Sequence, residues 1–120
     1  MSGREWATEA YEALRRGETI QVRPRGHSMS GRIGNGDLVT LQPCQSETLV
    51  PGDMVLARIQ RRRYAHMVLH QVLECEPGRF LIGNNLGRID GWVSEEDVYG
   101  RVICVDTNAE PTDWTHRTRG

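Results

Sequence analysis

Hydrophobic residues follow two different periods along this chain. Near the N-terminus they recur at helical spacing, on one face formed by Trp6, Ala7, Ala10, Tyr11 and Leu14. Ser2 and Glu5 have the spacing of a capping box, and Gly17 stands where a helix C-cap is expected. The pattern therefore predicts one helix within residues 1–17.

From residue 18 onward the spacing changes to the alternation that is typical of β-strands. The expected strands are 20–22, 38–41, 54–59, 64–74, 80–82 and 98–105. Their connections are too short for parallel crossovers, so antiparallel hairpins are expected. We predict a mainly β fold, with an N-terminal helix followed by six or seven strands in a coiled, partly closed sheet. The β domain would span residues 18–106, followed by a polar tail at 107–120.

Two local features have simple structural interpretations. Gly100 lies inside the last expected strand, which indicates a β-bulge or a close approach of another backbone. Arg61, Arg62 and Arg63 lie between two expected strands, so we interpret them as a solvated hairpin turn.

Composition narrows the possible functions. The chain has 120 residues, enough for one small domain, and all fifteen basic residues are arginine. The absence of lysine excludes a P-loop and any lysine base or Schiff base. The net charge of −1 argues against nucleic acid as a partner. No apolar run approaches the ~20 residues of a membrane-spanning helix. Three cysteines without Cys-x-x-Cys spacing indicate reduced thiols, a cytoplasmic location and no zinc site.

Ser28 is the candidate nucleophile. It lies in the turn Gly26-His27-Ser28-Met29. A nucleophilic serine needs an exposed tight turn whose N–H groups face the developing oxyanion, and Gly26 would let a substrate approach the backbone closely. By itself, this short motif is more typical of an ordinary turn.

The candidate bases are His66 and His70. Both fall on one face of the strand expected at 64–74. Four residues along a strand span roughly 13 Å, which is too far for one shared metal ion. A carboxylate could orient the base, and the candidates are Asp37, Asp53 and Asp90. The first two follow glycines just before strands, as turn residues do, whereas Asp90 is expected in a loop, either as the orienting group or as a turn residue.

The ordered set of motifs resembles the S24/S26 peptidase superfamily, which includes LexA-like repressors and signal peptidases. The corresponding segments, over residues 18–105, are Gly26-His27-Ser28-Met29, Gly36-Asp37-Leu38-Val39, Gly52-Asp53-Met54-Val55, Leu69-His70-Gln71-Val72 and Gly83-Asn84-Asn85. The stretch from Asn84 to Trp92 is also similar to small S24/S26-like proteins associated with phages and actinobacteria.

The resemblance implies a soluble serine endopeptidase of bacterial or phage origin that needs no cofactor. Most bacterial members use a serine/lysine dyad, so this chain instead resembles the signal peptidases in which histidine replaces the lysine. The context of Leu69 to Val72 favours His70 as the base, with His66 as the rival from LexA-like spacing. The resemblance makes Asp90 the third catalytic member and assigns Gly26 and Met29 to the oxyanion and substrate-binding turn. It also implies an extended peptide substrate with small side chains at the cut, and a possible homodimer.

Departures from the family pattern keep other functions open. Ser30-Gly31 stands where the family usually has proline, and neither an Ala-Gly cleavage bond nor a hydrophobic anchor precedes Gly26. We therefore do not expect a self-cleaving repressor or a membrane-anchored signal peptidase. The main alternative is a catalytically inactive S24/S26-like module that binds a peptide or protein. A structural β domain of a phage or mobile element is the third interpretation.

Overall fold

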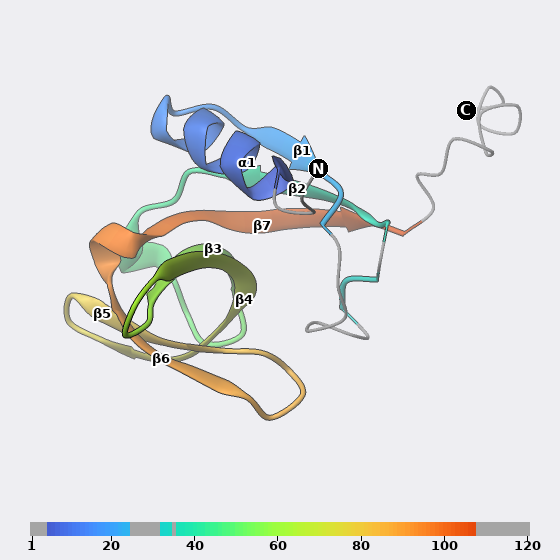
Figure 1. The fold of residues 1–120 in the computed structure, drawn as a ribbon. Helices are drawn as coiled ribbons and strands as arrows, with labels where there is room; N and C mark the ends of the chain where they lie inside the picture. The colour runs from blue at the N-terminus through green and yellow to red at the C-terminus, as the bar shows by residue number, and fades with distance from the viewer. Residues whose placement is uncertain (1–4, 25–31, 35, 108–120) are drawn as a thin grey trace, which may run out of the picture.

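A computed structural model describes residues 5–24, 32–34 and 36–107 of the chain, leaving the side chain of Glu5 undescribed (Figure 1). Within these described residues, one helix, α1 (Glu5–Arg15), precedes seven strands and two short 3₁₀ turns (Ser46–Thr48 and Glu95–Asp97). The strands are β1 (Ile20–Val22), β2 (Leu38–Gln42), β3 (Met54–Gln60), β4 (Ala65–Glu76), β5 (Arg79–Gly83), β6 (Ile89–Ser94) and β7 (Val98–Asp106).

All seven strands belong to one antiparallel sheet in the order β1-β2-β7-β3-β4-β5-β6. The sheet coils strongly without closing into a barrel, as Figure 1 shows for the curl of β3 and β4. The mainly β fold with one N-terminal helix is confirmed. The seventh strand is β6, a segment expected to be a loop. This strand lacks a regular alternation of buried and exposed residues, because Ile89 and Trp92 are exposed and Gly91 lies within it.

Helix α1 ends as its sequence predicts. The Glu18 N–H donates to the Ala13 carbonyl at 2.9 Å, and the Gly17 N–H donates to the Leu14 carbonyl at 3.0 Å. These two bonds form a Schellman motif with Gly17 at C′. The buried side of the helix includes Ala7, Ala10 and Leu14, so the predicted apolar face is confirmed. Ser2, the other expected cap, lies outside the described residues.

Two hydrophobic cores lie on opposite faces of the sheet. The first, under α1, contains Ala10, Leu14, Val22, Ile33, Val39, Leu41, Met54, Leu56 and Leu69. The second, inside the curl of β3 to β6, contains Leu49, Val55, Ala57, Ile59, Val68, Val72, Phe80, Ile82 and Val93. Consecutive β3 residues enter different cores, so this central strand is buried on both faces and its apolar run is continuous.

Gly100 combines both features predicted for it. The β3–β7 register shifts beside it, where Leu56 pairs with Gly100 and Ala57 with Val98. A Cβ at Gly100 would lie 2.8 Å from the Leu14 methyls and 2.9 Å from the Gln42 carbonyl oxygen. The absent side chain therefore lets α1 and β2 approach β7 closely.

Gly100→Ala is expected to lower the free energy of unfolding by about 1–3 kcal/mol, because the added methyl overpacks a site bounded partly by backbone. Chemical denaturation of both proteins measures this difference. Equal midpoints and slopes would contradict the close packing of α1 on β7.

No helix within the described ranges is long and apolar enough to cross a membrane.

Candidate functional site

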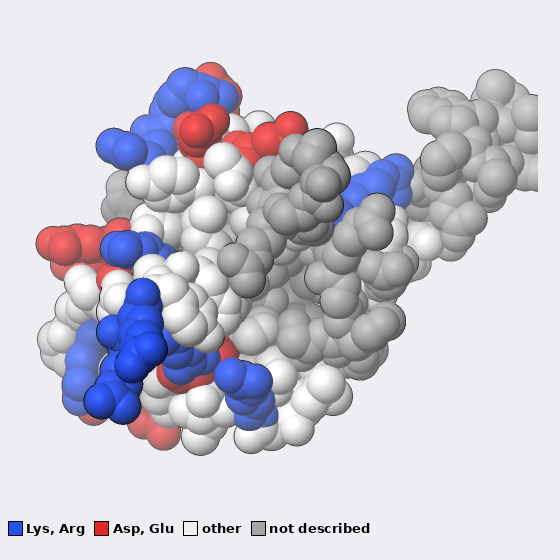
Figure 2. Space-filling view, in the orientation of Figure 1, with Lys and Arg blue, Asp and Glu red and all other residues white. Residues whose placement is uncertain are grey.

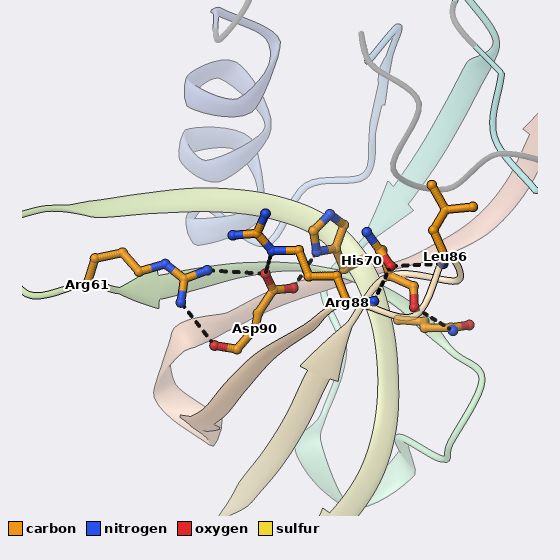
Figure 3. A network of polar contacts seen from close by, with 7 residues as sticks. Arg61, His70, Leu86, Arg88 and Asp90 are labelled. Atoms are coloured by element: carbon orange, nitrogen blue, oxygen red, sulfur yellow. Dashed lines mark hydrogen bonds and ion pairs between the residues drawn. The ribbon is translucent and has the colours of Figure 1, made fainter.

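The candidate site is centred on a buried pair, His70 and Asp90. His70 lies on β4 opposite Val55 of β3, and Asp90 lies on β6, with β5 between their strands. The His70 Nδ1 atom is 2.5 Å from Asp90 Oδ2, and the two side chains are 9% and 2% exposed. Figure 3 shows the two side chains meeting edge to edge. The sequence-predicted base and orienting carboxylate are therefore in direct contact.

A β-bulge directs Asp90 toward the interior. In the β5–β6 ladder Ile82 pairs with Gly91 and Gly83 pairs with Ile89, so Asp90 is the extra residue on β6. Gly91 has φ +126°, a conformation that side chains rarely adopt, and it completes the bulge. Ile89 is consequently exposed while Asp90 is buried. The expectation that Asp90 lies in a loop is wrong, because the bulge places it within a strand.

Asn84, rather than Asp90, closes the β5–β6 turn. Its side-chain oxygen accepts hydrogen bonds from the N–H groups of Leu86 at 2.8 Å and Arg88 at 2.9 Å. These bonds add to the backbone bond in which the Asn84 N–H donates to the Arg88 carbonyl at 2.9 Å. Asn84 therefore has the turn role that was the alternative for Asp90. The Asp90 carboxylate contacts His70 instead.

Two arginines also reach Asp90, and neither was expected in the site. Arg61 donates to the Asp90 backbone carbonyl at 3.1 Å and to Oδ1 at 3.3 Å (Figure 3). Arg88 Nε lies 3.7 Å from the same Oδ1. Arg61 comes from the β3–β4 turn, where Figure 2 shows several basic side chains gathered. Its interpretation as a purely solvated turn residue is therefore wrong, whereas Arg62 and Arg63 are exposed.

The arrangement fixes the chemistry available to His70. An ionised carboxylate only accepts hydrogen bonds, so the proton of the neutral ring lies on Nδ1. Nε2 is then the basic nitrogen of the ring. Arg61 and Arg88 supply positive charge beside Oδ1 of Asp90, while Oδ2 contacts His70. In hydrolase triads a buried carboxylate holds the basic histidine in one tautomer. His70 and Asp90, together with Arg61 and Arg88, have the residue types for this arrangement.

His66, the rival base, lies at the other end of β4. It pairs with Ile59 near the hairpin turn, and its ring lies 5.6 Å from that of Tyr64, centroid to centroid. The β3–β4 register is regular between His66 and His70, so the two residues are a full four strand positions apart. Among the described residues, no group of three His, Cys, Asp or Glu side chains could hold a metal ion.

Asp37 and Asp53 occupy turns before β2 and β3. Asp37 Oδ2 accepts from the Gly34 N–H at 2.6 Å, and Asp53 Oδ2 accepts from the Val50 N–H at 3.0 Å. Both carboxylates therefore cap the turn that starts three residues earlier, as their sequence context predicts. Arg101 NH1 also lies 3.9 Å from Asp53.

Ser28, Gly26 and Met29 lie outside the described residues. The chain resumes at Arg32, whose guanidinium donates at 2.9 Å both to the Gly52 carbonyl and to the Gln71 side-chain oxygen. Gln71 directly follows His70 on β4, and successive side chains of a strand point to opposite faces of the sheet. Arg32 is therefore attached next to His70 along the strand but on the other face of the sheet.

The three cysteines are free thiols and differ in exposure. Cys44 is half-buried, and burial raises the pKa of its thiol, although Arg101 partly opposes this effect. Cys75 and Cys104 are exposed.

We expect iodoacetamide to alkylate Cys44 several-fold more slowly than Cys104 near neutral pH. A raised pKa lowers the thiolate fraction below that pKa, and burial limits access as well. Peptide mass spectrometry over a time course measures both rates, and raising the pH should speed Cys44 alkylation. Alkylation of Cys44 first would contradict its placement.

Comparison with known proteins gives no match, whether to a family, to a curated protein or to a solved structure.

Proposed function

We propose that this protein is a serine endopeptidase of the S24/S26 type, with Ser28 as nucleophile, His70 as base and Asp90 as the group that orients His70. The observation that carries the proposal is the buried His70–Asp90 pair. The two residues are twenty positions apart in sequence and meet through a β-bulge, a feature common next to active sites. The ordered S24/S26 motifs named both residues independently of this contact.

The attachment of Arg32 supports a role for Ser28 at this site. Ser28 and Arg32 are four positions apart, which is a distance of at most about 14 Å in a fully extended chain. Because Arg32 contacts Gln71, the residue after His70 on β4, this length limits how far Ser28 can lie from that part of the strand.

In the proposed reaction, the Ser28 hydroxyl attacks the carbonyl carbon of an extended peptide while His70 Nε2 takes its proton. The Ser28 N–H, with the turn that contains Gly26 and Met29, holds the oxyanion. The protonated His70 then gives its proton to the leaving amine, and water hydrolyses the acyl-enzyme through the same base. Asp90 balances the charge on the imidazolium in both steps.

A fluorophosphonate probe tests the nucleophile without a known substrate, because it forms a stable adduct only with an activated serine. We expect one adduct on the wild-type chain, mapped by mass spectrometry to Ser28 and absent from Ser28→Ala. If no adduct forms at any pH between about 6 and 9, the catalytic proposal is wrong and the chain is better described as a binding module.

A further inference from the structure

A pocket lies between α1 and the β3–β4 hairpin. Its volume is about 410 Å³, and its lining includes Thr8 and Tyr11 from the helix, Arg58 and Met67 from the hairpin, and Tyr99 from β7. Small-molecule sites typically measure about 300–1,000 Å³. Neither His70 nor Asp90 lines this pocket, so it is separate from the proposed catalytic pair.

The pocket exists because α1 is too short to cover the sheet. Eleven helical residues span roughly 16 Å, and the helix packs mainly on β1, β2 and β7. Arg58 and Met67 are a cross-strand pair on the same face as Leu56 and Leu69, which the first core buries. This face is therefore covered at one end and open at the end that carries Arg58.

Arg58 provides an available positive charge. It is exposed, and no hydrogen bond or ion pair joins it to another described residue. Arg15, by contrast, already donates to the Tyr11 hydroxyl at 3.2 Å. Arg58 is the only Arg, Asp or Glu among the described residues that line the pocket, and His66 also lines it. A single arginine suits a monoanion.

Tyr99 adds a hydrogen-bond donor. Burial, more than its other surroundings, raises the pKa of the Tyr99 phenol, so the hydroxyl stays protonated at neutral pH. A protonated phenol donates a hydrogen bond to an anion, as an ionised one could not.

The remaining walls favour an aromatic body on the ligand. Tyr11 and Tyr99 pack edge to face with ring centroids 4.7 Å apart. Met67 is partly buried beside the first core, and its thioether makes favourable contacts with aromatic rings. A further ring would extend this cluster through edge and face contacts.

We infer that this pocket binds a small aromatic monocarboxylate, with Arg58 pairing with the carboxylate, the Tyr99 hydroxyl donating to it, and the ring lying against Met67. Arginine suits this role because its planar guanidinium can hold both oxygens of a carboxylate. The site stands independently of the proposed peptidase reaction.

Titration of the ¹⁵N-labelled full chain with phenylpropionate, followed by NMR, tests the inference. We expect saturable shifts at Arg58, Met67 and Tyr99, and at least about tenfold weaker binding of uncharged phenylpropanol, equivalent to 1.4 kcal/mol. Arg58→Gln should weaken phenylpropionate binding similarly. Arg62→Gln, which removes an exposed arginine of the nearby turn, should leave it unchanged.

The Arg58 side chain is exposed, so its replacement is not expected to unfold the protein, and the unshifted amide spectrum checks this. Three results would overturn the inference: no saturable shift with phenylpropionate, equal affinity in the two arginine variants, or shifts confined to residues outside the pocket.

Discussion

Asp90→Asn is expected to slow fluorophosphonate labelling of Ser28 by about 10²- to 10⁴-fold at neutral pH. The buried carboxylate can only accept a hydrogen bond from His70 Nδ1, whereas an asparagine amide can donate to it. Donation to Nδ1 would move the ring proton to Nε2 and remove the base. The second-order labelling rate constant, measured by intact-protein mass spectrometry, reports this loss directly.

Asp53→Asn is the matched control. Asp53 is also a carboxylate that accepts a backbone N–H, but it caps a turn and does not contact His70. Its labelling rate should stay close to that of the wild type. Because Arg61 and Arg88 surround Asp90, circular dichroism and thermal melting must show that Asp90→Asn is folded. A folded Asp90→Asn variant that is labelled at the wild-type rate would show that Asp90 does not orient the base.

Leu56→Ala is expected to lower the free energy of unfolding by about 2–5 kcal/mol. Leu56 is fully buried on the central strand β3, and it belongs to the core under α1. Removing its side chain loses buried apolar contacts and leaves a cavity that the sheet on both sides can fill only partly. Urea denaturation, analysed with a common slope, measures the effect.

Ile103→Ala is the control for this substitution. Ile103 lies on β7 and is 48% exposed, so its truncation should cost less than about 1 kcal/mol. If the two variants lost similar stability, the sheet would not be arranged with β3 at its buried centre.

Most of the fold follows from local patterns in the sequence. Alternation of apolar residues predicted the strands that face a core, and Gly17 predicted the end of the helix, because these signals depend on nearby residues alone. Strand β6 was missed because it is an edge strand with exposed Ile89 and Trp92. Arg79 stacks on the Trp92 ring at 4.2 Å, a contact that no periodicity reveals.

The candidate site could be predicted only in part. The motif order named His70 and Asp90, but their contact depends on a bulge whose position is set by the β5–β6 register. Arg61 was missed because an arginine in a hairpin turn is usually solvated. Its contact with Asp90 joins residues 29 positions apart and arises from the curl of the sheet.

The role of His70 as the base is tested most directly by the labelling rate of Ser28 in His70→Gln and His66→Gln. Glutamine can still donate a hydrogen bond to Asp90 but cannot act as a base at neutral pH. We expect His70→Gln to lose at least about 10²-fold in labelling rate, as loss of a general base does, while His66→Gln stays near the wild type. Retention of labelling in a folded His70→Gln chain, or its loss in His66→Gln alone, would contradict the assignment of His70 as the base.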